Sequence, residues 1–273
     1  MARTRILAFI LTGVFLVAEG HSSAEVSAYD AAKEAAIGAA LARQISNRST
    51  ALDDLFVRDY IRELGHQLAR RLPGEKYSWE FEVIRENQGG STHEAVAIPG
   101  GHIFIPAPLI LAVENEAELA GMLAHSMAHV AARDKMRLAA RAEADGSSGV
   151  PLMGPGMGLL APSEYLGTLR SLELEADRTA VKTVSAAGYD PIGLLEYIRR
   201  TQSPATARSG MYSILPPREE RIAALEEELA DLPTGGRWSS SEFAAVQEKV
   251  RQLTAPTHVA PKTPPTLFRE DEQ

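Results

Sequence analysis

The amino-acid sequence predicts an α+β fold that is mainly helical, with a small β-sheet beside the helix that carries the candidate functional residues. Two observations lead to this fold class. Apolar residues recur at the spacing of amphipathic helices over most of the chain, whereas the region between residues 76 and 105 shows the alternation of half-buried strands. With 273 residues, 45% of them hydrophobic, the chain can bury the core of one main domain with helical extensions.

Two helices are expected before the sheet. Residues 31–44 form an alanine-rich stretch. Residues 52–72 place apolar side chains at helical spacing, namely Leu52, Leu55, Phe56, Tyr60, Leu64 and Leu68. We expect both segments to be scaffold helices.

Three short strands are expected next. The segment Lys76–Ile84 alternates, with Tyr77, Trp79, Phe81 and Val83 on one face. Ala95–Ile98 and His102–Ile105 then flank the turn residues Pro99-Gly100-Gly101, which is the pattern of two strands joined by a tight turn.

A long helical run follows the strands, from Asn115 to Arg141. Residues 145–162 hold too many glycines and prolines for a stable helix and are expected to form a mobile loop beside the site. A second long helix is predicted over residues 163–187, and Gly188 ends it.

Further helices are expected toward the C-terminus. Asp190-Pro191 is typical of a helix start, because a capping side chain precedes a proline at the first helical position. Residues 218–232 and 239–253 have helical patterns, while residues 254–273 contain four prolines and a charged end. The predicted organisation is therefore a signal peptide 1–24, a domain 25–232, a C-terminal helix 233–253 and a disordered tail 254–273.

The N-terminal segment has the pattern of a secretory signal. Arg3 and Arg5 precede an apolar stretch over residues 6–18, which is short for a membrane span, and small residues suitable for cleavage follow. This predicts a periplasmic or secreted protein, with an uncleaved anchor and a possible loose envelope association as the alternative.

Charge and cysteine content narrow the classes of partner. The formal net charge is −8, which argues against nucleic acid or anionic lipid as a partner. The chain has no cysteine, so it has no disulfide framework and no cysteine for lipid attachment.

The residues that carry chemistry begin with His125 and His129. Two histidines four residues apart share one face of a helix and can bind one metal ion, as in the His-Glu-x-x-His motif of zinc peptidases. In that motif the glutamate accepts a proton from the metal-bound water. Ser126 stands at the glutamate position, so the sequence keeps two metal ligands and lacks the general base.

Two acidic residues on the second long helix complete the pattern. Glu173 lies 44 residues beyond His129, and Asp177 follows it on the same helix face. One carboxylate can therefore bind the metal while the other accepts a hydrogen bond from a ligand imidazole. The alternative is that both acids belong to a solvated face together with Arg170, Arg178 and Lys182.

Over residues 53–222 the sequence resembles the membrane-associated and periplasmic gluzincin metallopeptidases that include HtpX, BepA and the CAAX prenyl protease. Four blocks in the family's order carry the resemblance, namely Pro99-Gly100-Gly101-His102-Ile103-Phe104-Ile105, Glu116 to His125, Glu173 to Asp177, and Ala187-Gly188-Tyr189-Asp190-Pro191.

This resemblance implies a zincin-like fold and one Zn²⁺ per chain. It implies that His125, His129 and Glu173 are the zinc ligands and that Asp177 supports a ligand imidazole. Residues Ile103, Phe104 and Ile105 would belong to an edge strand that pairs with an extended peptide.

The sequence departs from the family pattern at functional positions. Ser126 replaces the catalytic glutamate, Glu94 stands where the family usually has asparagine, and Asp134 stands where it has histidine. Leu215 stands where a His-Pro pair is common in the family, which leaves only Pro216. Arg221 still matches the family's later arginine and is a possible catalytic residue.

Three functions remain open from the sequence. The first is a secreted zinc metalloendopeptidase with weak or no hydrolysis, in which Glu94, Glu164 or Glu175 could replace the missing base. The second is a non-catalytic pseudo-peptidase that binds extended or unfolded polypeptides in a chaperone or scaffold role. The third is a metal-free helical envelope protein with packed histidines. The oligomeric state stays undetermined.

Overall fold

The computed structural model describes residues 23–74, 76–85, 94–144, 163–203 and 215–255. Three predicted segments lie wholly or mostly outside these residues. They are residues 1–22 of the predicted signal peptide 1–24, the predicted loop 145–162, and residues 256–273 of the predicted tail 254–273. No helix in the described ranges has the length and apolar content that crossing a membrane requires.

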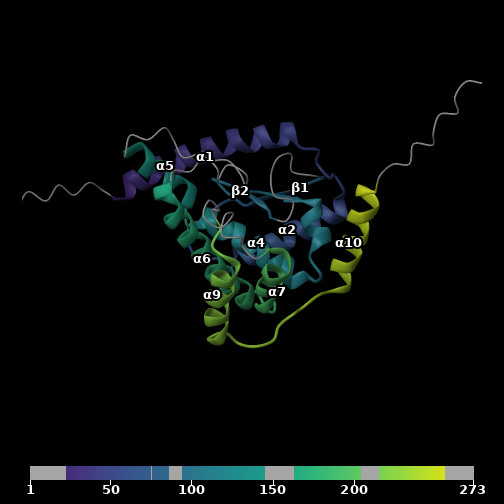
Figure 1. The fold of residues 1–273 in the computed structure, drawn as a ribbon. Helices are drawn as coiled ribbons and strands as arrows, with labels where there is room; N and C mark the ends of the chain where they lie inside the picture. The colour runs from purple at the N-terminus through teal and green to yellow at the C-terminus, as the bar shows by residue number, and fades with distance from the viewer. Residues whose placement is uncertain (1–22, 75, 86–93, 145–162, 204–214, 256–273) are drawn as a thin grey trace, which may run out of the picture.

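The described residues form a mainly helical α+β structure, which confirms the predicted fold class (Figure 1). The elements are α1 (Ser23–Arg48), α2 (Leu55–Ala69), β1 (Glu80–Ile84), β2 (Val96–Ile98), β3 (His102–Pro106), α3 (Ala107–Ala112), α4 (Glu116–Ala131), α5 (Asp134–Ala144), α6 (Ser163–Ala186), α7 (Ile192–Thr201), α9 (Arg218–Ala230) and α10 (Ser241–Thr254).

The three strands form one mixed sheet in the order β1-β3-β2. Strand β3 pairs in parallel with β1 and antiparallel with β2. The predicted tight turn between β2 and β3 is confirmed, because Gly100 and Gly101 adopt φ angles of 85° and 96°, a conformation that glycine adopts without strain.

The position of β3 corrects one prediction. Ile103, Phe104 and Ile105 were expected on an edge strand that pairs with a peptide, but β3 lies between its two neighbours and has no open edge. Alternation in a sequence identifies a strand without giving its place in the sheet, which is why the prediction was wrong. Strand β2 is the neighbour of the metal-site helix, and it stands at one end of the strand order.

Helices cover both faces of the sheet (Figure 1). On one face Ile84, Val96, Ile98 and Phe104 pack against Ala42 of α1. The other face belongs to the main core, in which α4 is the central helix, since every residue of α4 except His129 is buried. The helix with the candidate ligands is therefore held on all sides by packing.

The long helix predicted from Asn115 to Arg141 is divided in two. Helix α4 ends at Ala131, and Arg133 has a left-handed φ of 57° before α5 begins. The Arg133 Nε donates a 2.7 Å hydrogen bond to Glu34, a buried carboxylate of α1. The apolar periodicity continues across this break, so the sequence pattern does not reveal it.

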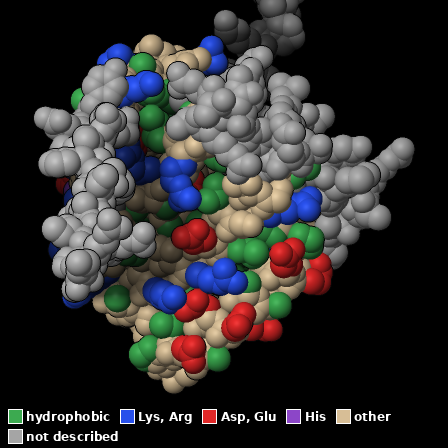
Figure 2. All heavy atoms as spheres, turned by 90° about the vertical axis from the view of Figure 1, so that its left-hand side faces the viewer, with side chains coloured by type: hydrophobic (Ala, Val, Ile, Leu, Met, Phe, Trp, Pro, Cys, Tyr) green, Lys and Arg blue, Asp and Glu red, His purple; other side chains and the backbone are tan. Residues whose placement is uncertain are grey.

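The later helices enclose α4. Helix α6 packs along α4, and α7 and α9 pack against α6 and each other. Helix α10 adds Phe243, Val246 and Val250 to the main core, with the Phe243 ring 6.2 Å from that of Tyr60. On the face shown in Figure 2, basic and acidic side chains are interspersed rather than gathered into a patch of one sign.

Candidate metal centre

The start of α4 sets the position of the two histidines. The side chain of Asn115 caps the helix by accepting a 2.9 Å hydrogen bond from the Glu118 backbone N–H. Ten residues later His125 projects from the same face as His129, and the two imidazole rings meet edge to face with centroids 4.8 Å apart. The predicted pairing of these side chains is therefore present in the structure.

Helix α6 brings Glu173 to the same point. One Glu173 carboxylate oxygen lies 3.4 Å from His125 Nε2, and the other lies 3.5 Å from His129 Nε2. Ligand atoms that bind zinc tetrahedrally at 2.0–2.2 Å are separated from one another by about 3.4 Å. The two imidazole–carboxylate separations are near this value, and the three ligand atoms lie within 4.8 Å of one another, so the three side chains could hold one metal ion. In the described part of the chain they form the one group of three or more histidines and acids with such spacing.

Each imidazole is held from behind by a carboxylate. His125 Nδ1 lies 2.8 Å from Asp177 Oδ1, and His129 Nδ1 lies 2.8 Å from Asp134 Oδ2. Both Nε2 atoms therefore face Glu173 and the candidate metal position, which is the arrangement that metal-binding histidines usually have. Asp177 therefore lies beside His125, one of the candidate ligands.

The contact of Asp134 with His129 was missed by the sequence interpretation. On a continuous helix, residue 134 would lie about 140° around the axis from His129. The break at Arg133 instead turns the first residue of α5 back toward the imidazole. The sequence signal, an aspartate five residues after a ligand, has meaning only when the end of α4 is known.

Arg221 reaches the centre from α9. Its Nε and Nη2 atoms donate hydrogen bonds of 2.7 Å to the two oxygens of Asp177, and Nη1 donates to Gln202 at 3.1 Å. Asp177 is fully buried and Arg221 is nearly so. The structure therefore gives Arg221 the role of holding Asp177 against His125, with the guanidinium behind the ligands rather than among them.

Burial and the neighbouring carboxylates shift the pKa values of the two histidines in opposite directions. Burial lowers the pKa of His129, but Glu173 and Asp134 more than offset it and raise that pKa to about 10. The pKa of His125 is likewise raised, because Asp177 and Glu173 outweigh the effect of burial. Burial raises the pKa of Glu173, yet the two histidines hold it well below its usual range. Metal binding must displace these protons, so metal affinity should increase with pH.

Ser126 stands at the position of the general base in the motif, but its hydroxyl group cannot act as a proton acceptor for water. Its buried hydroxyl lies 3.1 Å from the Met122 carbonyl oxygen of the same helix and 3.4 Å from the Ala95 carbonyl oxygen. Both partners accept hydrogen bonds, so the serine proton is directed at backbone carbonyls. A serine hydroxyl cannot hold a further proton near neutral pH.

The three acids predicted as replacement bases differ in location. Glu175 is exposed to solvent on α6. The side chain of Glu164 lies outside the described residues. Glu94 is partly buried, and burial together with the charge of Glu173 raises the pKa of its carboxyl group against the opposing effects of His125, Arg221 and His129. Of the two acids whose side chains are described, Glu94 is the one whose pKa is influenced by the charges of the candidate ligands.

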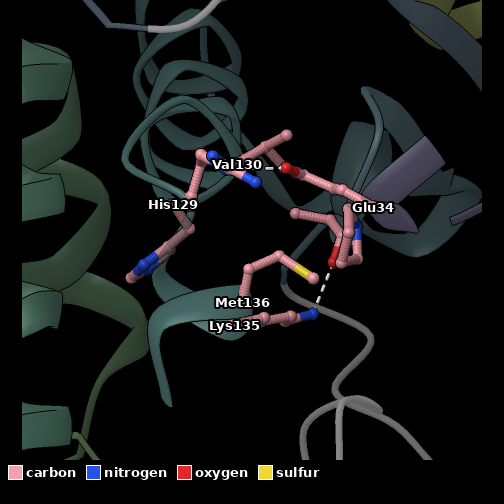
Figure 3. A pocket seen from close by; sticks show the side chains of 8 residues that line it. Glu34, His129, Val130, Lys135 and Met136 are labelled. Atoms are coloured by element: carbon pink, nitrogen blue, oxygen red, sulfur yellow. Dashed lines mark hydrogen bonds and ion pairs between the residues drawn. The ribbon is translucent and has the colours of Figure 1, made fainter. Parts of the chain in front are cut away.

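A small pocket lies behind the centre, where α1, β2 and the start of α5 meet (Figure 3). Lys135 donates a hydrogen bond to the Ala97 carbonyl of β2, and burial lowers the pKa of its amine to about 8. In Figure 3 the His129 ring turns away from Lys135 and Glu34. The hydrogen bond of Lys135 therefore joins α5 to β2, and the imidazole is directed to the other side.

Replacing Asp134 by alanine should weaken zinc binding by about 10- to 100-fold, because His129 would lose the carboxylate that orients its ring. Competition with a chromophoric chelator measures this affinity. The matched control is Glu175→Gln, which removes an exposed acid from the helix that carries Glu173. An Asp134→Ala protein that binds zinc as tightly as this control would contradict the role given to Asp134.

Comparison with known proteins agrees with this geometry. The family model described as peptidase family M48 matches residues 57–229, a span that contains the three candidate ligands, Asp177 and Arg221. The chain is 28% identical over 221 residues to a putative beta-barrel assembly-enhancing protease of Vibrio cholerae, which covers 74% of this chain and 45% of the relative.

Two other relatives extend the comparison. The beta-barrel assembly-enhancing protease of Escherichia coli K12 is 26% identical over 70% of this chain and 42% of its own length. The mitochondrial metalloendopeptidase OMA1 of Schizosaccharomyces pombe is 28% identical over 56% of this chain and 47% of its own length. The chain thus spans less than half the length of these relatives. The match to the family model covers more than half of the chain, and the protein belongs to peptidase family M48.

Proposed function

We propose that the protein is a zinc metallopeptidase whose single zinc ion is held by His125, His129 and Glu173, and that its hydrolysis of peptide bonds is weak. The observation that carries the proposal is the geometry of the three side chains. The separations of 3.4 and 3.5 Å between the Glu173 oxygens and the two imidazole Nε2 atoms are near the ligand separation of tetrahedral zinc, and each histidine Nδ1 lies 2.8 Å from a carboxylate oxygen. Membership of a metallopeptidase family supports the same metal.

Zinc, when bound, would polarise the scissile carbonyl and lower the pKa of a coordinated water toward about 7. The residues of the chain determine what else the centre can do. Asp177 and Asp134 keep the imidazoles in place, and Arg221 keeps Asp177 in place. Ser126 cannot accept the proton that must leave the attacking water, and a positioned base contributes about 10²- to 10⁴-fold to the rate.

The proposed substrate class is polypeptide, and the proposed location is the periplasm or outside the cell. The curated relatives are named as proteases, which supports a polypeptide substrate. The basic and apolar N-terminal segment supports export. The net charge of −8 gives no support to a nucleic-acid partner.

A second candidate function is a pseudo-peptidase that binds extended or unfolded chains without cleaving them. The observation in its favour is that the Ser126 hydroxyl is directed at two backbone carbonyls at the position where the motif requires a base. In that case zinc would join α4 to α6 as a structural clip.

Restoring glutamate at position 126 tests the proposed function. The zinc-loaded Ser126→Glu protein should cleave casein faster than the wild type, by up to about 10²- to 10⁴-fold, because it regains a base on α4. Ser126→Ala is the control and should cleave at the wild-type rate. Stoichiometric zinc with no cleavage by any of the three proteins would favour the pseudo-peptidase, and absence of zinc would overturn both functions.

A further inference from the structure

The residue that precedes β2 lies against the place of the missing base. Ser126 contacts the carbonyl oxygen of Ala95 at 3.4 Å, and both residues are buried. Glu94 is the next residue toward the N-terminus. A carboxylate is therefore attached to the backbone segment that contacts position 126, although position 126 itself carries none.

Glu94 precedes β2 and is not part of the strand. Within the strand, Val96 and Ile98 pack toward α1, whereas Ala97 packs into the main core beside α4. Glu94 lies in a bend that ends before the strand begins. Glu94 therefore stands outside the strand, and the alternation of β2 does not assign its side chain to either face of the sheet.

The charges of the candidate centre influence the pKa of Glu94, which is raised. Burial has the largest effect and raises this pKa, the charge of Glu173 raises it as well, and His125, Arg221 and His129 act in the opposite direction. The charges of all three candidate ligands therefore act on the Glu94 carboxyl group. Its negative charge also raises the pKa of the buried Tyr197, after the larger effect of burial.

Glu94 does not belong to the set of candidate ligands. The group of side chains with metal-binding spacing consists of His125, His129 and Glu173 and does not include it. In the ranges that the structure describes, no hydrogen bond or ion pair joins the Glu94 carboxylate to another residue. A partly buried carboxylate without such a partner keeps its lone pairs available for water or substrate.

We propose that Glu94 is the proton acceptor of this centre, supplied from the segment before β2 in place of the glutamate that α4 lacks. The inference rests on the proposed metallopeptidase function. In the step assigned to it, an O–H bond of the attacking water breaks and its proton moves to a Glu94 oxygen, while the water oxygen bonds to the scissile carbonyl carbon. The same proton then moves to the amide nitrogen as the C–N bond breaks, which regenerates the carboxylate.

The test compares Glu94→Gln in two backgrounds. In the wild-type background it should lower kcat for casein-derived peptide cleavage by at least about 10-fold, because the amide cannot take up the proton. In the Ser126→Glu background it should change kcat by less than about 3-fold, because the restored glutamate acts as the base. A structural role for Glu94 would lower kcat equally in both backgrounds.

Two further measurements separate the proton transfer from folding and binding. Zinc stoichiometry and the affinity of the metal-free protein for a fluorescein-labelled casein peptide should be the same for Glu94→Gln and wild type. The shorter carboxylate of Glu94→Asp should retain part of the activity.

The outcomes distinguish this inference from the proposed function. Equal cleavage by Glu94→Gln and wild type, with Ser126→Glu active and zinc bound, would overturn the role of Glu94 and leave the metallopeptidase intact. Undetectable wild-type cleavage beside an active Ser126→Glu protein would overturn it as well. Absence of zinc from all variants would overturn the proposed function itself.

Discussion

Replacing Arg221 by methionine should lower the free energy of unfolding of the metal-free protein by about 3–5 kcal/mol. Arg221 donates two 2.7 Å hydrogen bonds to Asp177, whose side chain has no exposed surface. Methionine fills a similar volume but leaves the Asp177 carboxylate buried without its cationic partner. Equilibrium unfolding in urea, followed by circular dichroism, measures the difference.

Arg199→Met is the matched control for this change. Arg199 also pairs with carboxylates, Glu196 and Glu226, but its side chain is 35% exposed, so its loss should cost less than about 1 kcal/mol. Burial raises the pKa of Asp177, but the opposing effect of Arg221 and His125 is larger in total, so the pKa of Asp177 lies below its usual value. The pair therefore stabilises the protein above the unfolded pKa of about 4, and this stabilisation is lost as pH falls through the lower folded pKa. Equal effects of the two substitutions at neutral pH would contradict the account of Arg221.

Replacing His125 by alanine should remove stoichiometric zinc. Losing a residue that only orients a ligand weakens metal affinity by roughly 10- to 100-fold. Losing His125, which is one of the three proposed protein ligands, should weaken the zinc affinity by more than this. Chelator-sensitive peptide cleavage should disappear with the metal. Elemental analysis after dialysis, together with chelator competition, measures the change.

His102→Ala provides the control for histidine loss. His102 pairs with Glu80 at 3.1 Å in the sheet and does not belong to the group with metal-binding spacing. This variant should bind one zinc ion per chain with wild-type affinity. If both variants lose zinc, or neither does, the assignment of His125 as a ligand is wrong.

The parts of the site that depend on local geometry could be predicted from the sequence. The i, i+4 spacing of His125 and His129 requires only that residues 125–129 be helical, and the buried apolar positions around them ensure a helix. The meeting of this helix with Glu173 is a tertiary contact, and it was expected because of the resemblance to a known family rather than from periodicity. The structure places the three side chains together.

The parts that depend on tertiary context could not be predicted in the same way. The helix break at Arg133 is associated with its ion pair to Glu34, which lies 99 residues away in the chain. The contact between Asp134 and His129 follows from that break. The central place of β3 is set by parallel pairing with β1, and a strand pattern alone contains no information on its neighbours.

Motif matching alone does not detect a general base that is supplied from another position in the chain, as we propose for Glu94. Ser126 by itself indicates a lost activity, whereas its contact with Ala95 brings the neighbouring Glu94 into consideration. Departures from a family pattern at two positions that meet in space can therefore describe one altered site. The double-variant comparison at positions 94 and 126 addresses this directly.

The measurement that tests the central claim most directly is a crystal structure of the zinc-loaded protein with anomalous diffraction data at the zinc edge. We expect one strong anomalous peak per chain, about 2.0–2.2 Å from His125 Nε2, His129 Nε2 and an oxygen of Glu173, with no protein carboxylate at position 126. A peak that does not contact all three of these side chains, or no peak after zinc loading, would contradict the account.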